Sequence, residues 1–569
     1  MLLERAFMGD PVNSATKVFI VSLDGATFDV VRPLARQGYM PNLGKVLENG
    51  LACELESVIP PVTAPAWTSF MTGKHPSKHG IFDFARLDVD SNSWKINNSQ
   101  HIRAKTLWQI LSEKGKRVIV LNLPYTYPTY EVNGVMVSGW DAPTMRSFTH
   151  PAELGTRIFE LIPDYGSTLD LSMWNYLPAD SNVEFNSFTD KLIRSAEQGA
   201  ELAAHFVGTE AWDVFMVHFQ QTDWIQHKLW SYIEKACYDR SDKTQRVERV
   251  RECYRRFDEL VGRLMVDSGH PVQIILSDHG FGRYRGLICP NYFLTKWGYF
   301  RLQTENESKL KHLFKHSNST AVRKLYRSLA KTKHSFDAHR SAKKYKSWAD
   351  MVEETVPRDR FPIDWKYTRV AAVGGSEAAF LYVNVSGRSV TVRGTIDQGM
   401  EYEALIAELI SRFQDIRDPN SGDKLLARVA RGSEMYSSVG EGILLPDLVL
   451  MPVDGYVFST SAADGFVPEI SGEGNHRHNG ILLLQGDGFR RTVPDFHPYL
   501  VDLAPTILHM LGLPVPADMD GRVLQEIFSD ARQVHYEDVN NSIAPKATDY
   551  TEEEAELIEQ RLKALGYVE

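Results

Sequence analysis

Six Asp and His residues stand beside short apolar segments, where they could bind cations. They are Asp24, Asp223, His227, Asp278, His279 and His476. Carboxylate oxygens and imidazole nitrogens are ligands of borderline divalent cations such as zinc. Together the six side chains suffice for two cations with about three protein ligands each and open positions for a substrate. Taken singly, each residue also fits a turn, a polar loop or an i,i+4 helix pair.

A hydroxyl that could act as a nucleophile lies at Thr63, within the segment PPVTAPAWT of residues 60–68. Thr is a common helix N-cap, and Pro65 is tolerated in a first helical turn. We therefore expect the hydroxyl beside the free N–H groups of a helix, which bind anions. Next to two cations, the hydroxyl would lose its proton and attack phosphorus. The alternative is a helix cap without a chemical role.

Apolar runs bounded by turn residues predict the strands that position these side chains. The runs alternate with segments whose apolar residues recur every three or four positions, which is typical of parallel βαβ units. We therefore expect an α/β fold with a doubly wound, mostly parallel central sheet. The predicted strands are residues 18–23, 118–121, 214–217, 272–276, 448–451 and 481–484, and the predicted helices are residues 40–47, 105–114, 152–161, 190–206 and 247–266.

The position of His476 makes a specific demand on this sheet. In open α/β sheets the functional edge lies beyond the carboxyl ends of the strands. Asp24 and Asp278 follow predicted strands, whereas His476 precedes the strand at residues 481–484. His476 reaches the same edge only if that strand is reversed, so we predict a mixed sheet with this strand antiparallel to the others.

Residues 297–441 lack the regular alternation of predicted strands and helices and are interpreted as one insertion. Its first part is basic, because residues 301–348 contain 13 Lys or Arg and 3 acidic residues. Arg323, Lys324 and Arg327 are candidates for contacts to an anionic substrate, and a solvated helical face is the alternative. The predicted catalytic core then comprises residues 1–296 and 442–532, followed by a helical tail at residues 533–569.

Composition narrows the class of protein. The 569 residues carry a formal net charge of −10, which argues against a binder of nucleic-acid polymers or anionic membranes. The four cysteines form no C-x-x-C pair, the N-terminus lacks the apolar segment of a secretory signal, and no apolar run approaches the about 20 residues of a membrane span. We expect a cytoplasmic enzyme without a membrane partner, and the sequence leaves the oligomeric state open.

The order and context of these residues resemble the alkaline phosphatase superfamily. The matching segments are LDG at residues 23–25, TAPAWT at 63–68, TGKHPSKHGI at 72–81, Asp223 with His227, SDHG at 277–280, GNHR at 474–477 and DLAPTIL at 502–508. They are most similar to the type I phosphodiesterase/nucleotide pyrophosphatase family, including its phosphohydrolase and phosphomutase-like relatives. The resemblance implies a three-layer α/β sandwich with an inserted α+β cap.

The resemblance also implies roles for the candidate residues. Thr63 would be the nucleophile and form a covalent phosphothreonine. One metal would be bound by Asp223, His227 and His476, and the other, beside Thr63, by Asp24, Asp278 and His279. Two zinc ions are the expected cofactors, with manganese or iron as alternatives. The expected substrate is a small-molecule phosphate ester, with a phosphodiester preferred.

Other activities remain as alternatives on the same fold. A sulfatase needs an oxidisable Cys or Ser and an Arg four residues later, where this sequence has Thr63 and Trp67. A phosphomonoesterase or phosphomutase would use the same site, and Arg477, next to a proposed ligand, is a candidate substrate contact that would favour a monoester. The Asn that nucleotide pyrophosphatases carry after His79-Gly80-Ile81 is absent. A metal-binding protein without activity is the alternative from another class.

Overall fold

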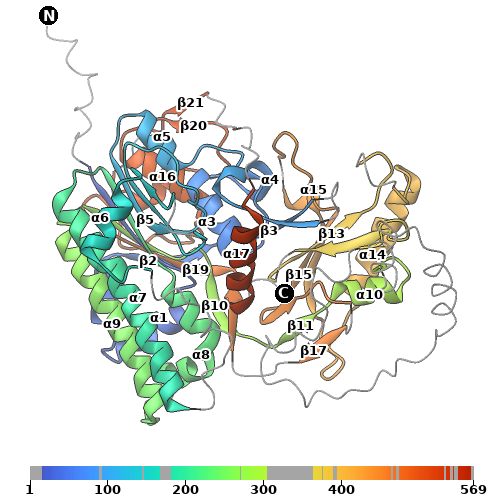
Figure 1. Cartoon of the computed structure of the whole chain (residues 1–569), viewed down its shortest axis with the longest axis horizontal. Helices are drawn as coiled ribbons and strands as arrows, with labels where there is room; N and C mark the ends of the chain where they lie inside the picture. The colour runs from blue at the N-terminus through green and yellow to red at the C-terminus, as the bar shows by residue number, and fades with distance from the viewer. Residues whose placement is uncertain are drawn as a thin grey trace, which may run out of the picture.

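An eight-stranded mixed sheet forms the centre of the larger part of the molecule (Figure 1). In spatial order its strands are β2 (Leu51–Glu56), β19 (Asn479–Gln485), β9 (Val272–Leu276), β1 (Val18–Leu23), β8 (Val214–Phe219), β5 (Val118–Leu123), β6 (Gly134–Ser138) and β7 (Thr149–His150). β1 is parallel to both β8 and β9, and every residue of β1 and β8 is buried. Burial on both faces explains why these strands are continuous apolar runs.

The computed structural model does not describe every residue of the chain. It describes residues 16–88, 93–143, 147–166, 181–269, 271–303, 363–374, 376–388, 394–436, 438–462, 465–468, 473–530, 533–538, 543 and 549–565, without the side chains of 563–565. Arg323, Lys324 and Arg327 therefore lie outside the described residues.

Strand β19 runs antiparallel to both of its neighbours, β2 and β9. The predicted reversed strand at residues 481–484 is thereby confirmed. Because β19 is reversed, the residues that precede it lie at the sheet edge where β1, β8 and β9 end. His476 reaches the other candidate ligands for this reason.

Helices cover both faces of the sheet, which gives the predicted three-layer α/β sandwich (Figure 1). The five predicted helices are present, with boundaries shifted by a few residues except for the longer α7. One layer contains α1 (Phe28–Arg36), α2 (Pro41–Asn49), α7 (Asn182–Thr209), α8 (Gln221–Tyr238) and α9 (Gln245–Asp267); the other contains α3 (Thr63–Thr72), α5 (Leu107–Glu113) and α16 (Leu503–Met510).

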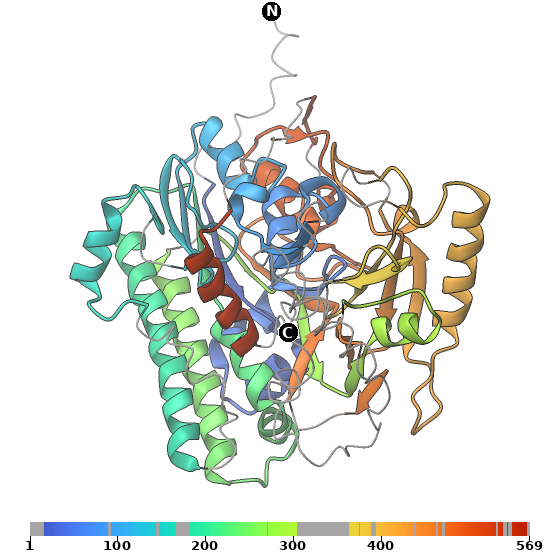
Figure 2. The ribbon, with the colours of Figure 1, turned by 45° about the vertical axis from the view of Figure 1, so that its right-hand side comes forward.

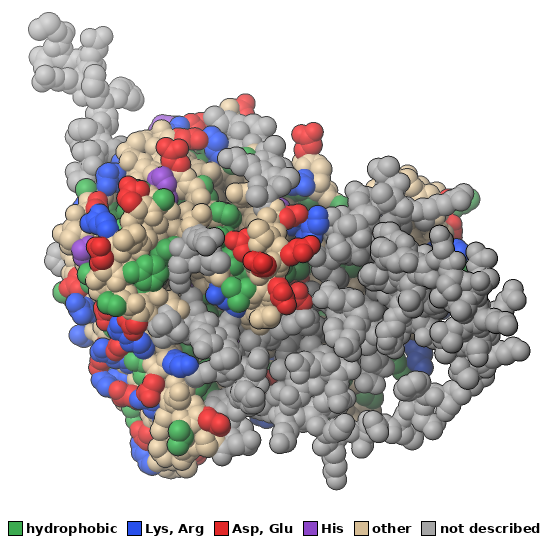
Figure 3. All heavy atoms as spheres, in the orientation of Figure 1, with side chains coloured by type: hydrophobic (Ala, Val, Ile, Leu, Met, Phe, Trp, Pro, Cys, Tyr) green, Lys and Arg blue, Asp and Glu red, His purple; other side chains and the backbone are tan. Residues whose placement is uncertain are grey.

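The outer face of α7 and α9 is a solvated, charged surface. Figure 3 shows cationic and anionic side chains intermixed over it, and ion pairs such as Arg256–Glu197 and Arg249–Asp190 link the two helices. Such alternation of sign offers no single-sign patch on this face for a polyanion. No helix in the described ranges is long and apolar enough to cross a bilayer.

A second, antiparallel sheet forms the cap at the side of the core (Figures 1 and 2). Its order is β12 (Val370–Val373), β13 (Ala379–Val383), β15 (Leu448–Pro452) and β14 (Leu426–Arg431), with α14 (Met400–Gln414) packed against it. The prediction that residues 448–451 form a strand of the core sheet is wrong, because β15 pairs with β13 and β14. The cap therefore extends beyond residue 441.

The C-terminal helix α17 (Glu552–Leu565) lies across the front of the molecule near the junction of core and cap (Figure 1). Thr551 and Glu554 cap its N-terminus reciprocally, because each backbone N–H is bonded by the other side chain. Ile558 and Leu562 are buried against the core, and Arg561 donates to the carbonyl oxygen of Ala142 at 2.6 Å. The predicted tail helix thus fastens the end of the chain to the core.

Candidate active site

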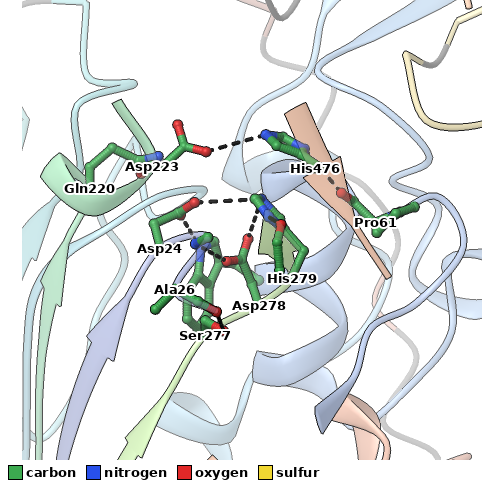
Figure 4. Close-up of polar contacts among 12 residues, drawn as sticks. Asp24, Ala26, Pro61, Gln220, Asp223, Ser277, Asp278, His279 and His476 are labelled. Atoms are coloured by element: carbon green, nitrogen blue, oxygen red, sulfur yellow. Dashed lines mark hydrogen bonds and ion pairs between the residues drawn. The ribbon is translucent and has the colours of Figure 1, made fainter. Parts of the chain in front are cut away.

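The six candidate ligands come from four segments that meet at one edge of the central sheet. Asp24 directly follows β1, Asp278 and His279 follow β9, and Asp223 and His227 lie one turn apart near the start of α8. His476 lies in β18 (Gly474–Arg477), which pairs with β10 (Gly280–Arg283), so that His476 faces Phe281 in register. Figure 4 shows the carboxylates and rings converging on a common centre.

One group of donor atoms is formed by Asp223, His227 and His476. Asp223 Oδ1 lies 3.4 Å from His227 Nε2 and 3.2 Å from His476 Nε2, and the two Nε2 atoms are 3.0 Å apart. His476 Nδ1 donates to the carbonyl oxygen of Pro61 at 3.1 Å. Since that ring nitrogen carries the proton, the neutral ring presents a lone pair at Nε2 to the group.

A second group is formed by Asp24, Asp278 and His279. His279 Nε2 lies 3.5 Å from Asp24 Oδ1 and 3.3 Å from Asp278 Oδ2. The Nδ1 of His279 donates to the carbonyl oxygen of Gly280 at 3.1 Å, which again leaves a lone pair at Nε2. The rings of His279 and His476 stack with centroids 3.7 Å apart, so the two groups adjoin.

The second group leaves its inward-facing atoms without hydrogen bonds. One oxygen of each carboxylate is held from outside: Asp24 Oδ2 accepts from Trp67 Nε1 at 2.8 Å, and Asp278 Oδ1 from the Gly25 backbone at 3.2 Å. The other oxygens, together with His279 Nε2, are buried and have no hydrogen-bond partner among the described residues. Only acceptors face one another here, which fits a cation between them.

The electrostatics of the cluster agree with that fit. Burial, together with the neighbouring carboxylates of Asp278 and Asp223, raises the pKa of Asp24 well above its ordinary value. Burial raises the pKa of Asp278 to about 8 and lowers that of His279. Among the described residues no Lys or Arg forms an ion pair with Asp24 or Asp278. A bound cation would neutralise these carboxylates and keep them ionised at neutral pH.

Gly25 allows the chain to turn beside the cluster. Its φ is 64°, and a Cβ at this position would lie 2.9 Å from the Phe281 ring and 3.3 Å from Asp223 Oδ1. A side chain would therefore be strained and would displace a candidate ligand. This explains the Asp-Gly pair at the end of β1.

Thr63 is the first residue of α3, and Val62 occupies the N-cap position. The prediction that Thr63 caps the helix is therefore wrong by one residue. Its hydroxyl is free of a capping bond: Thr63 Oγ1 is buried and has no hydrogen-bond partner among the described residues. By contrast, the Thr68 and Thr72 hydroxyls donate to the carbonyl oxygens four residues earlier, each at 2.8 Å.

Residues on both sides of Thr63 contact the two groups of candidate ligands, one before helix α3 and one within it. Pro61, two residues before Thr63, accepts from His476, and Trp67, four residues after it, donates to Asp24. Because residues four apart lie on one helix face, the Thr63 side chain lies on the face that meets Asp24. We therefore expect the free Thr63 hydroxyl on the side of the second group of candidate ligands.

Comparison with known proteins agrees with this geometry. A model of the type I phosphodiesterase / nucleotide pyrophosphatase family matches residues 18–477, a span that contains all the candidate ligands and Thr63. The chain belongs to this family. It is a hydrolase that acts on phosphate ester bonds, as predicted.

Solved structures similar to this family member include two hydrolases. Phosphonoacetate hydrolase from Sinorhizobium meliloti 1021, in complex with phosphonoacetate, is 13% identical with a TM-score of 0.49, and the alignment covers 87% of this chain and 95% of that chain. Human ectonucleotide pyrophosphatase / phosphodiesterase 5 is 13% identical with a TM-score of 0.45, at 90% and 100% coverage.

Two buried residues that sequence analysis did not select support Asp24 in this phosphodiesterase family member. Trp67 donates to Asp24 Oδ2, and His218 Nε2 lies 3.5 Å from the same oxygen. Ser22 and Gln220 hold the His218 ring through Nδ1 at 3.0 Å and Nε2 at 2.9 Å. The spacing of four between Thr63 and Trp67 was the available signal for Trp67; nothing comparable marks His218.

Arg477, a candidate substrate contact, is directed along the backbone. Its guanidinium donates to the carbonyl oxygens of Asn475, His476 and Arg283. Successive residues of a strand point to opposite faces, so Arg477 and its neighbour His476 point apart. Arg477 contacts these backbone carbonyls rather than the side chain of a candidate ligand.

A cavity of about 420 Å³ lies between the core and the cap. Phe82, Trp365 and Phe380 contribute apolar walls, and Arg103 contributes a guanidinium whose Nη1 donates to the Glu441 carbonyl oxygen at 2.9 Å. None of the six candidate ligands lines this cavity. Gly374 lines the cavity and begins the loop that carries Glu377, whose Oε1 lies 3.2 Å from Nδ1 of the candidate ligand His476.

Proposed function

We propose that the chain is a metal-dependent phosphodiesterase of small-molecule phosphate esters that uses Thr63 as its nucleophile. The observation that carries the proposal is the buried, hydrogen-bond-free Thr63 hydroxyl at the start of a helix that bonds to Asp24 through Trp67 and follows Pro61, whose carbonyl oxygen accepts from His476. Two divalent cations, proposed to be zinc, would be held by Asp223, His227 and His476 and by Asp24, Asp278 and His279. When bound, they supply charge neutralisation for the attacking and leaving oxygens.

The protein's own contribution is alignment. The N-terminus of α3 presents backbone N–H groups and a positive dipole end to the phosphoryl oxygens, which orients phosphorus toward Thr63 Oγ1. The Oγ1–P bond forms as the bond from phosphorus to the leaving oxygen breaks, and the proton lost by Thr63 balances the one that the departing alkoxide takes up to leave as the alcohol. Water then attacks phosphorus, the Oγ1–P bond breaks, and one proton of that water restores the Thr63 hydroxyl. Phosphoryl transfer depends on such alignment more than on a general base.

A diester is the preferred substrate because the cluster holds few cationic side chains. A phosphomonoester dianion needs more positive contacts than a diester monoanion. No Lys or Arg forms an ion pair with Asp24 or Asp278 among the described residues, and Arg477 is engaged with carbonyl oxygens. Phosphomonoester hydrolysis and phosphomutase activity on the same site are the alternatives.

The cap is proposed to bind the non-reacting part of the substrate. Arg103 in the cavity, and Arg323, Lys324 and Arg327 of the basic stretch, are the proposed anion contacts. Replacing Arg103 with Gln should raise KM for an anionic substrate more than it lowers kcat, because this contact is remote from phosphorus.

The decisive test compares turnover of bis(4-nitrophenyl) phosphate and 4-nitrophenyl phosphate by the zinc-loaded wild type, Thr63→Ala and Thr63→Ser. Thr63→Ala should lower kcat by on the order of 10³-fold or more with unchanged metal content, and Thr63→Ser should keep part of the activity. Thr72→Ala, which removes a hydroxyl bonded within the same helix, is the matched control. A Thr63→Ala enzyme near the native rate would overturn the nucleophile, and a preference for the monoester would overturn the diester assignment.

A further inference from the structure

One carboxylate of the cap, that of Glu377, lies beside the candidate metal ligand His476. Glu377 lies in the loop between β12 and β13, and its side chain is 5% exposed. Its Oε1 is 3.2 Å from His476 Nδ1, and its Oε2 accepts from the Ser376 hydroxyl. This contact joins a cap residue to a proposed ligand that is close to 100 residues away in sequence.

The two nitrogens of the His476 ring face different partners. Nε2 faces Asp223 and His227, at 3.2 Å and 3.0 Å, whereas Nδ1 faces Glu377 and the Pro61 carbonyl oxygen. Both partners of Nδ1 accept hydrogen bonds, so Nδ1 carries the proton and Nε2 keeps the lone pair that binds a cation. A carboxylate behind a ligating imidazole fixes the ring orientation and increases its basicity.

Glu377 is itself held firmly by the cap. The next residue, Ala378, is buried in a cluster with Phe380, Tyr436 and Val449. The preceding residue, Ser376, accepts a backbone hydrogen bond from Phe458 at 2.6 Å. The position of the Glu377 carboxylate therefore follows the position of the cap sheet rather than that of the core.

We propose that Glu377 is a positioning residue through which the seating of the cap on the core controls His476 as a metal ligand. This proposal rests on the proposed function, since it assumes a cation at Asp223, His227 and His476. It gives the cap a second role beside the proposed binding of the substrate, because a residue of the cap contacts His476.

The test measures zinc binding to the metal-stripped full chain by competition with a chromophoric chelator. Wild type should bind two equivalents. Glu377→Gln keeps a hydrogen-bonding side chain without its charge and should weaken one equivalent about tenfold, and Glu377→Ala should weaken it up to about 100-fold. The other equivalent should change less than about twofold, and kcat should fall more than KM rises. Glu401→Gln, which neutralises an exposed cap acid paired with Arg369, is the matched control.

Each outcome separates the possible roles. If both equivalents bind as in wild type in Glu377→Gln and Glu377→Ala, Glu377 does not position a ligand. If both equivalents weaken together and the unfolding temperature falls, Glu377 is a structural residue and the proposal is wrong. If wild type itself binds no zinc, manganese or iron, the proposed two-metal function fails, which is distinguishable because it does not depend on the variant. Should Glu377→Ala fail to fold, Glu377→Gln alone decides.

Discussion

Trp67 donates its indole N–H to Asp24 Oδ2 over 2.8 Å, and both side chains are fully buried. The bond joins helix α3 to the end of strand β1. It leaves Asp24 Oδ1 to face His279 Nε2 at 3.5 Å. This hydrogen bond thus orients the Asp24 carboxylate toward His279 and holds α3, the helix that begins with Thr63, beside Asp24.

Trp67→Phe should therefore lower the affinity for the metal that Asp24, Asp278 and His279 are proposed to bind. The variant keeps most of the packing but removes the donor, so we expect about 10–100-fold lower affinity for one metal equivalent and a similar fall in kcat/KM. Chelator competition and steady-state kinetics measure both quantities. Trp108→Phe is the control, because Trp108 is equally buried and its Nε1 bonds to no described residue. Equal effects of the two substitutions would contradict a specific role for the bond.

Removing one ligand from each group should remove one metal from each. Asp223→Ala and Asp24→Ala should each lose about one equivalent, because two remaining ligands hold a cation poorly. Metal analysis after gel filtration gives the stoichiometry, with Asp29→Asn, an exposed acid at the start of α1, as the control. Two equivalents in both Ala variants would show that these carboxylates are not ligands.

An ion pair between Asp518 and Lys74 joins the C-terminal part of the core to the residues that follow α3. Removing one partner should lower the free energy of unfolding more than removing the other. Lys74 Nζ lies 2.6 Å from Asp518 Oδ2, with the Lys74 side chain 3% exposed and that of Asp518 29% exposed. Asp518→Ala leaves a buried ammonium and should lower the free energy of unfolding by about 3–5 kcal/mol. Lys74→Met leaves a carboxylate that water reaches, so a smaller loss of about 1.5–3 kcal/mol is expected. Thermal unfolding of both variants checks the ranking, and the reverse order would contradict the argument.

Asp141 should make the stability of the protein depend on pH. Burial raises its pKa from 3.8 to about 7. Below pH 3.8 the carboxyl is neutral in both states; between pH 3.8 and 7 it ionises only in the unfolded chain, so stability falls as pH rises, by up to about 4 kcal/mol. Asp141→Asn keeps an oxygen for the Tyr125 backbone N–H, which donates to Asp141 at 3.0 Å.

The stability of Asp141→Asn relative to wild type should therefore increase from pH 4 to pH 8. Thermal unfolding of both proteins in the same buffers measures this difference, and effects of pH on the metal cluster cancel in the comparison. A difference that stays constant with pH would show that Asp141 is ionised in the folded protein at neutral pH.

The sequence by itself was sufficient for the strands that bring the candidate ligands together. Strands buried on both faces are mostly apolar, so β1, β8 and β9 were predicted directly from their apolar runs, and Asp24 and Asp278 follow β1 and β9 at the edge where parallel strands end. The reversal of β19 followed from His476 alone, since a residue before a strand reaches that edge only when the strand is antiparallel.

Tertiary structure decided which sheet an apolar run joins and what surrounds each ligand. Residues 448–451 are as apolar as a core strand, yet β15 belongs to the cap, because composition reports burial and not the identity of the pairing partner. The spacing of Trp67 from Thr63 was its one local signal and Glu377 has none, because their contacts with Asp24 and His476 join segments far apart in sequence. The first contact forms only when α3 packs beside β1 and the second only when the cap packs on the core, and such long-range packing leaves no periodicity in the chain.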